Sequence, residues 1–134
     1  QDAMSAFTCH GVLARHPDLR LVLVENGAEW VPGFLEQLGD TYRKMPHEFD
    51  GDPVEQFKRN VWVSPFHEDD IAELGGLLGA DHLCFGSDYP HPEGLAEPCS
   101  YVDHLPEGLP EDDVKAIMGG NLAQIMKVDT LAAA

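Results

Sequence analysis

The sequence predicts an α/β protein in which parallel strands alternate with helices. Short runs rich in β-branched and apolar residues occur at positions 20–24, 61–64 and 83–86. Segments in which apolar residues recur at helical spacing separate these runs, so that the order along the chain is α-β-α-β-α-β-α-α. Strands that run in the same direction need a crossover between them, and this alternation therefore favours a parallel sheet.

The first half of the chain contains the first strand and the helices around it. Residues 3–16 predict a helix that stops where His16 meets Pro17. The strand at 20–24 ends at Glu25 and is followed by a helix over 30–42, whose early Pro32 is tolerated in a first turn. Residues 45–53 indicate a surface loop, and 54–59 a short helix.

The second half repeats the pattern twice. The strand at 61–64 leads to an acidic segment at 68–70, whose charge favours the start of a helix over 71–78. The strand at 83–86 runs into a proline-rich loop at 87–94. A further helix begins near Pro110 and is stopped by glycines at 119–120, after which Asn121 is expected to cap a last helix. We therefore expect one domain over 1–128 and a tail at 129–134.

Length and charge exclude several classes of protein. The 134 residues are far fewer than the roughly 250 of a closed eight-stranded barrel. A formal net charge of −16 disfavours nucleic acid and anionic membrane surfaces as partners, and no run of about 20 apolar residues indicates a membrane span. The three cysteines form no Cys-x-x-Cys pair, which fits a soluble protein of the reducing cytoplasm.

Polar residues follow each of the three predicted strands. They are Glu25 and Asn26, the segment 64–67, and Ser87 with Asp88. The carboxyl ends of parallel strands meet at one edge of the sheet, which is where the active sites of barrels lie. These residues are therefore the first candidates for a functional site.

The loop after the third strand carries a family resemblance. The string Phe-Gly-Ser-Asp-Tyr-Pro-His-Pro-Glu-Gly at 85–94 resembles the last-strand signature of the amidohydrolase-related family. Residues 19–32 resemble the strand and loop two units earlier, and 118–123 the closing helix. The resemblance covers nearly the whole chain and identifies it as the C-terminal part of such a protein.

What the resemblance implies is a partial (β/α) TIM barrel and metal-dependent chemistry. The family's distorted barrel holds one divalent metal, commonly zinc, and its members hydrolyse or non-oxidatively decarboxylate small carboxylated compounds. Asp88 would then be both a metal ligand and the carboxylate that accepts a proton from, or orients, the metal-bound water. The alternative is that Asp88 only caps the turn before Tyr89.

Two further residues are candidates beside Asp88. His91 is expected either to bind a substrate carboxylate or to steady Asp88, and its alternative is an ordinary loop histidine. Glu25 stands where decarboxylases of the family place a catalytic histidine, so it favours hydrolysis and a role as general acid or base. Its alternative is a cap or ion-pair partner of the helix near Trp30.

The chain lacks most of the metal ligands that the resemblance implies. No His-x-His pair occurs among its seven histidines, and only Asp88 corresponds to a ligand. One ligand cannot build a three-ligand catalytic zinc site. A piece of barrel also leaves strand edges uncovered, so we expect a homodimer or association with the missing barrel half.

Two other interpretations remain open. The chain could be a truncated, non-catalytic barrel module with a structural or interaction role. A complete small open-sheet domain ranks last, because no glycine-rich phosphate loop follows any strand.

Overall fold

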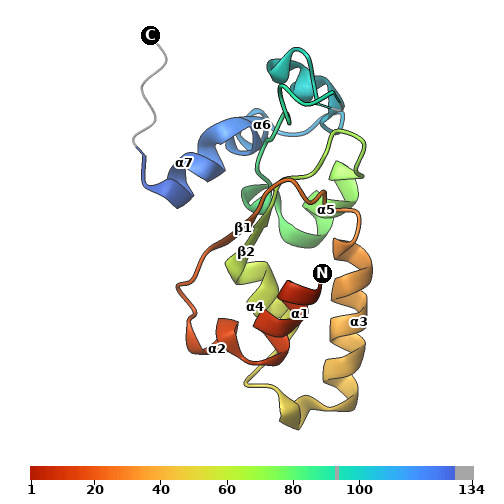
Figure 1. Cartoon of the computed structure of the whole chain (residues 1–134), viewed down its shortest axis with the longest axis vertical. Helices are drawn as coiled ribbons and strands as arrows, with labels where there is room; N and C mark the ends of the chain where they lie inside the picture. The colour runs from red at the N-terminus through yellow and green to blue at the C-terminus, as the bar shows by residue number, and fades with distance from the viewer. Residues whose placement is uncertain (93, 129–134) are drawn as a thin grey trace. The chain divides into compact units, whose positions relative to one another are not determined.

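The computed structural model describes residues 1–92 and 94–128 and divides into two compact units. Unit 1 comprises residues 1–22 and 30–62, and unit 2 comprises residues 23–29 and 63–134. The predicted tail at 129–134 lies outside the described residues. Figure 1 shows the elements of each unit in chain order.

Unit 1 is helical, with helix α4 (Pro53–Asn60) in contact with the other three helices. These are α1 (Asp2–Cys9), α2 (Val12–Arg15) and α3 (Val31–Lys44), and a short 3-10 helix η1 (Pro46–Glu48) follows α3. The single helix predicted over 3–16 is thus two helices. The break falls at Gly11, which adopts a left-handed conformation (φ 67°) that glycine favours.

An aromatic cluster forms part of the core of unit 1. The ring centroid of Phe34 lies 5.6 Å from those of both Trp30 and Phe57, and Phe57 is fully buried. Helix α3 contributes this face because its apolar residues recur at helical spacing, as predicted. Asp52 caps the start of helix α4, because its carboxylate accepts hydrogen bonds from the backbone N–H groups of Val54 and Glu55.

Asn60, the last residue of α4, forms hydrogen bonds to the segment that precedes the first strand. Its side chain is fully buried, and its Nδ2 donates to the carbonyl oxygens of Pro17 and Leu19 at 3.0 and 2.6 Å. A buried side-chain amide needs such acceptors because it has lost water. The amide therefore holds the segment before β1 against the residue that immediately precedes β2.

The sheet is short and parallel. Strand β1 (Leu21–Leu23) pairs with β2 (Val61–Val63), and a parallel bridge joins Val63 to Leu83. The strand predicted at 83–86 is therefore reduced to a single bridge with one continuing hydrogen bond, from the Cys84 N–H to the Val63 carbonyl. The next N–H, of Phe85, donates instead to Ile117, which draws the chain away from β2.

Unit 2 continues with α5 (Ile71–Leu78), η2 (Ala80–His82) and η3 (Pro98–His104), followed by α6 (Glu111–Lys115), η4 (Ala116–Gly120) and α7 (Asn121–Met126). Asp70 caps α5, since its carboxylate accepts the N–H of Glu73. The prediction of a helix start after Pro110 is confirmed, and the helical path breaks at Gly119 as expected.

The prediction that Asn121 caps the last helix is wrong. Its side chain is buried, and Nδ2 donates to the carbonyl oxygens of Ala80 and Leu83 at 2.8 and 2.7 Å. Gly120 precedes the helix instead. The amide thus anchors the start of α7 to the first residue of η2 and to Leu83, the residue that follows η2.

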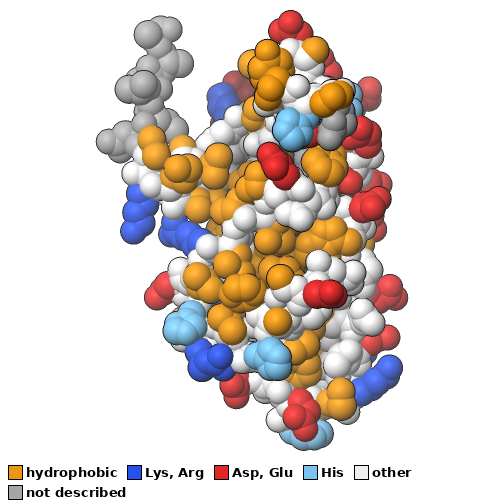
Figure 2. Space-filling view, viewed as in Figure 1, with side chains coloured by type: hydrophobic (Ala, Val, Ile, Leu, Met, Phe, Trp, Pro, Cys, Tyr) orange, Lys and Arg blue, Asp and Glu red, His pale blue; other side chains and the backbone are white. Residues whose placement is uncertain are grey.

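Acidic side chains are dispersed over the face drawn in Figure 2, with hydrophobic side chains between them. None of the helices in the described part of the chain has the length and apolar character of a membrane span.

Candidate functional site

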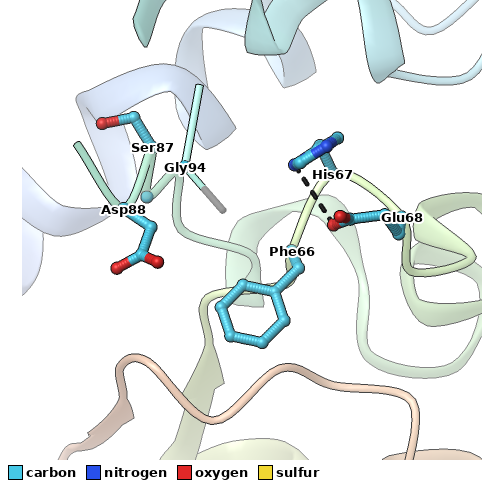
Figure 3. A pocket seen from close by; sticks show the side chains of 7 residues that line it. Phe66, His67, Glu68, Ser87, Asp88 and Gly94 are labelled. Atoms are coloured by element: carbon cyan, nitrogen blue, oxygen red, sulfur yellow. Dashed lines mark ion pairs between the residues drawn. The ribbon is translucent and has the colours of Figure 1, made fainter. Parts of the chain in front are cut away.

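A cavity of about 120 Å³ lies in unit 2 where two chain segments leave the sheet. One side is formed by Phe66, His67 and Glu68, which follow β2, and is called here the β2 wall. The other side is formed by Gly86, Ser87 and Asp88 and is called the Asp88 wall; Gly94 completes the lining. Figure 3 shows both walls.

Asp88 is held inside this arrangement rather than in open solvent. Its side chain is only 15% exposed, although it belongs to a loop. Its backbone has a φ of 55°, and Glu25, at the end of the β1 segment, has a φ of 57°. Left-handed conformations are uncommon for residues with a Cβ and cluster at functional sites. Two of the three candidate residues therefore occupy strained backbone positions.

Backbone hydrogen bonds within the loop hold the main chain of Asp88 in place. The N–H of His91 donates to the Asp88 carbonyl at 2.9 Å, and the N–H of Leu95 donates to the Ser87 carbonyl at 2.9 Å. Gly94 packs directly against this turn: a Cβ there would lie 2.8 Å from the Ser87 oxygen and 2.6 Å from the Asp88 carbonyl carbon. The loop is thus closed at its base, and only glycine fits at position 94.

The β2 wall is shaped by Asp69. One oxygen of its carboxylate, Oδ2, accepts the N–H of Phe66 at 2.8 Å and that of Ala28 at 2.9 Å. Ala28 belongs to the segment that follows β1, so a single carboxylate joins the loops after both strands. The acidic run at 68–70, predicted only as favourable charge for a helix start, therefore also organises the cavity.

The side chains differ in where they point. In Figure 3 the Asp88 carboxylate and the Phe66 ring lie on the same side of the walls, whereas the Ser87 hydroxyl points away. His67 and Glu68 face each other, with His67 Nδ1 3.1 Å from the Glu68 carboxylate. The His67 ring also packs edge-on against His104, at a centroid distance of 4.9 Å. The cavity thus combines two carboxylates, one imidazole and an aromatic ring.

The structure brings His91 close to Asp88 but not into the cavity. His91 Nδ1 lies 3.8 Å from Asp88 Oδ1, which permits an ion pair when the imidazole is protonated, and the His91 side chain is 59% exposed. Glu25 is exposed as well and is not among the residues that line the cavity. Of the three residues given a catalytic role, Asp88 is therefore the one that lines the cavity.

The donor groups in the chain do not complete a metal site. Within the described residues, no three His, Cys, Asp or Glu side chains come together in a way that would hold a metal ion. A catalytic zinc site needs three protein ligands. The carboxylate of Asp88 suits a divalent cation, but the remaining donors of such a site are not in the described part of this chain.

Two buried groups behind the walls have shifted proton affinities. Burial raises the pKa of the Cys84 thiol from its ordinary value of 9.0 to about 11. Burial also raises the pKa of Tyr101, and the negative charge of Asp69 adds to this effect. Both groups stay protonated at neutral pH, so Cys84 is neither a nucleophile nor a metal ligand there.

Part of the β2 wall was predicted. Phe66 and His67 belong to the segment 64–67, which was selected, like Asp88, by its position after a strand, and both residues line the cavity. Glu68, predicted only as part of the acidic segment before a helix, also lines the cavity. A chemical role for His67 was not predicted, because the chain has no His-x-His pair.

The fold and the cavity define a class: a parallel α/β protein whose candidate site lies where chain segments leave the sheet. The family model described as "Amidohydrolase" matches residues 1–125, and the chain belongs to this family. No curated protein matches the chain.

Solved structures agree with this assignment. An amidohydrolase from Mycobacterium avium subsp. paratuberculosis K-10 is 42% identical with a TM-score of 0.89, over 93% of this chain and 32% of its own. The 5-carboxyvanillate decarboxylase from Sphingomonas paucimobilis is 24% identical, with a TM-score of 0.73. The match covers 91% of this chain and 38% of the decarboxylase. A dihydroxybenzoic acid decarboxylase from Polaromonas sp. JS666, solved with bound manganese and the inhibitor 2-nitroresorcinol, is 17% identical. Its TM-score is 0.70, and the match covers 92% of this chain and 38% of the decarboxylase.

The similarity to the two decarboxylases is a similarity of fold alone, because their sequence identity is low. The chain spans about a third of the length of these proteins, so it corresponds to part of their barrel. The predicted partial TIM barrel and the predicted family are both confirmed.

Proposed function

We propose that this chain is the C-terminal portion, over residues 1–128, of a metal-dependent amidohydrolase that hydrolyses a small carboxylated compound, with Asp88 as its essential carboxylate. The observation that carries the proposal is the position of Asp88: a largely buried carboxylate in a cavity at the sheet exit, within a chain that belongs to the amidohydrolase family. Non-oxidative decarboxylation is the alternative reaction. The two decarboxylases of similar fold make it worth testing.

Each candidate residue has a separate role in the proposal. A carboxylate such as Asp88 accepts a proton from the attacking nucleophile. His91, 3.8 Å from Asp88, is positioned to orient the Asp88 carboxylate or to contact the carboxylate of a substrate. Glu25 is the candidate for a second acid or base, because it follows β1 in a strained conformation. Its exposure predicts a smaller contribution than that of Asp88.

We propose a divalent metal, zinc or manganese, as the cofactor of the whole protein, with Asp88 as the one ligand from this chain. Manganese is the metal bound in the Polaromonas enzyme of similar fold. Because the described residues offer no three-ligand group, the other ligands would have to come from outside this chain. The metal content of the purified full-length protein should therefore fall when Asp88 is replaced by alanine.

The test of the reaction is a matched pair of Asp→Asn substitutions in the full-length protein. Hydrolysis and CO₂ release are assayed with a panel of small aromatic and aliphatic carboxylated compounds. Asp88→Asn should lower kcat at least about a hundredfold, as expected for the loss of a general base. Asp18→Asn, an exposed residue of unit 1, should leave kcat unchanged. Equal activity of wild type and Asp88→Asn would refute the proposal.

A non-catalytic barrel module is the second candidate. It is favoured by the lack of a three-ligand group among the described residues and by the exposure of Glu25 and His91. If neither wild type nor Asp88→Ala binds metal or turns over any compound of the panel, this second candidate is the better account.

We also propose that the chain associates with a second copy of itself or with the rest of a barrel. Strand β1 is an edge strand in the sheet of the described residues, and edges favour pairing with another chain. Helix α7 and the residues after it expose apolar side chains: Leu122 is 37% exposed, Met126 64% and Val128 56%. A monomeric mass in light scattering at micromolar concentration would contradict a homodimer.

A further inference from the structure

A buried tyrosine lies directly behind the cavity without lining it. Tyr101 belongs to η3, its side chain is 0% exposed, and its hydroxyl donates to the Pro65 carbonyl at 3.0 Å. A phenol that is removed from water requires such a partner, and a buried carbonyl requires such a donor. The hydrogen bond therefore joins η3 to the residue immediately before the β2 wall.

The same tyrosine also contacts the other wall. Its ring packs on that of Phe85, with centroids 5.1 Å apart and planes inclined at 60°. Phe85 immediately precedes the Asp88 wall, whose first residue, Gly86, has no room for a Cβ: one there would lie 2.6 Å from the Ser64 hydroxyl. Tyr101 is thus a single side chain that touches the base of both walls.

Asp69 supplies the second connection. Its carboxylate accepts the N–H of Phe66, in the β2 wall, and the N–H of Ala28, in the segment after β1. The raised pKa of Tyr101, caused first by burial and second by Asp69, keeps the hydroxyl protonated and therefore a donor. Tyr101 therefore contacts Pro65, beside the β2 wall, and Phe85, beside the Asp88 wall. Asp69 binds the β2 wall and the segment after β1.

We propose that Tyr101 and Asp69 are positioning residues, which fix the β2 wall relative to the Asp88 wall and so place the Asp88 carboxylate opposite Phe66 and His67. The inference rests on the proposed function only for the importance of Asp88. The positioning is a property of the folded chain, and it is measurable without substrate or metal.

The experiment compares Tyr101→Phe with Tyr42→Phe in the full-length protein. Tyr42 lies in α3 of unit 1, where its ring packs against Phe49, and it serves as the matched control. Two quantities are measured by NMR: the backbone amide chemical shift of Asp88, and the hydrogen-exchange rate of the Phe66 amide. A residue that contributes only to stability would lower the melting temperature without moving the Asp88 amide signal in the folded protein.

Tyr101→Phe should displace the Asp88 amide signal and accelerate Phe66 exchange about two- to tenfold, the factor that corresponds to the loss of one hydrogen bond. Tyr42→Phe should do neither. Asp69→Ala should accelerate Phe66 exchange as well, whereas Asp69→Asn, which keeps an acceptor oxygen, should restore most of the protection. This second pair of variants tests the connection independently of Tyr101.

An unchanged Asp88 amide signal in Tyr101→Phe would overturn the proposal, as would an equal displacement in Tyr42→Phe. Failure of the proposed function has a different signature: Asp88→Asn then keeps full activity, whatever the NMR measurements show.

Discussion

Replacing Asn121 by alanine is expected to destabilise the protein by about 3–5 kcal/mol. Its side chain is 5% exposed, and Nδ2 donates to both Ala80 and Leu83. The substitution removes two hydrogen bonds, each of which contributes about 1 kcal/mol net. It also leaves buried carbonyls without this donor, and desolvation of such a group adds about 1–3 kcal/mol.

The free energy of unfolding is measured by urea denaturation of the full-length protein. Asn26→Ala is the matched control, because Asn26 is exposed and donates only to its neighbour Val24; its effect should stay within about 0.5 kcal/mol. Asn121→Asp should destabilise at least as much as alanine, since a carboxylate cannot donate and would face two carbonyl oxygens. An Asn121→Ala effect no larger than that of the control would show that the two carbonyls find other donors, and would refute the reasoning.

Three further predictions concern stability. Burial raises the pKa of Cys84 to about 11, so the folded state holds this proton more tightly than the unfolded state. The stabilisation is therefore complete below pH 9 and is lost as the pH rises through 11; Cys84→Ala, compared by urea denaturation, should show a weaker decline over this range. Asp70→Ala should cost about 1 kcal/mol in thermal unfolding through loss of the α5 cap, and Asp70→Asn much less. Asn60→Ala should cost about 2–4 kcal/mol, because Pro17 and Leu19 both lose a buried donor, whereas a smaller loss in denaturant would show that water replaces the amide.

The sequence predicted the elements whose signal is local. Helix α3 and strand β2 lie where apolar spacing placed them, and α5 begins after the predicted acidic segment. Three features were missed. The break of the first helix at Gly11 is local and follows from the left-handed conformation of that glycine. The other two depend on tertiary contacts: the segment at 83–86 exchanges most of its strand pairing for a hydrogen bond to Ile117, and η3 forms in a segment without apolar periodicity.

The candidate site was predicted only in part, for a similar reason. Asp88 was identifiable because a distinctive loop follows its strand, and the structure places its side chain in a cavity. Its role remains a prediction. The approach of Phe66 and His67 depends on Asp69 and Tyr101, which act over separations of 41 and 36 residues, and no local pattern reports contacts of that length. The expected proximity of Glu25 to the cavity likewise depends on how its loop turns after β1.

The closure of the Asp88 loop at its base has a consequence for engineering. The Leu95 to Ser87 hydrogen bond and the tight packing of Gly94 fix the base of the loop independently of the exposed side chains of Tyr89 and Pro92 near its tip. Randomising these two positions should therefore change what can approach the carboxylate without displacing it. A directed-evolution library aimed at new substrates would begin there and would leave His91, whose N–H donates to the Asp88 carbonyl, and position 94 untouched.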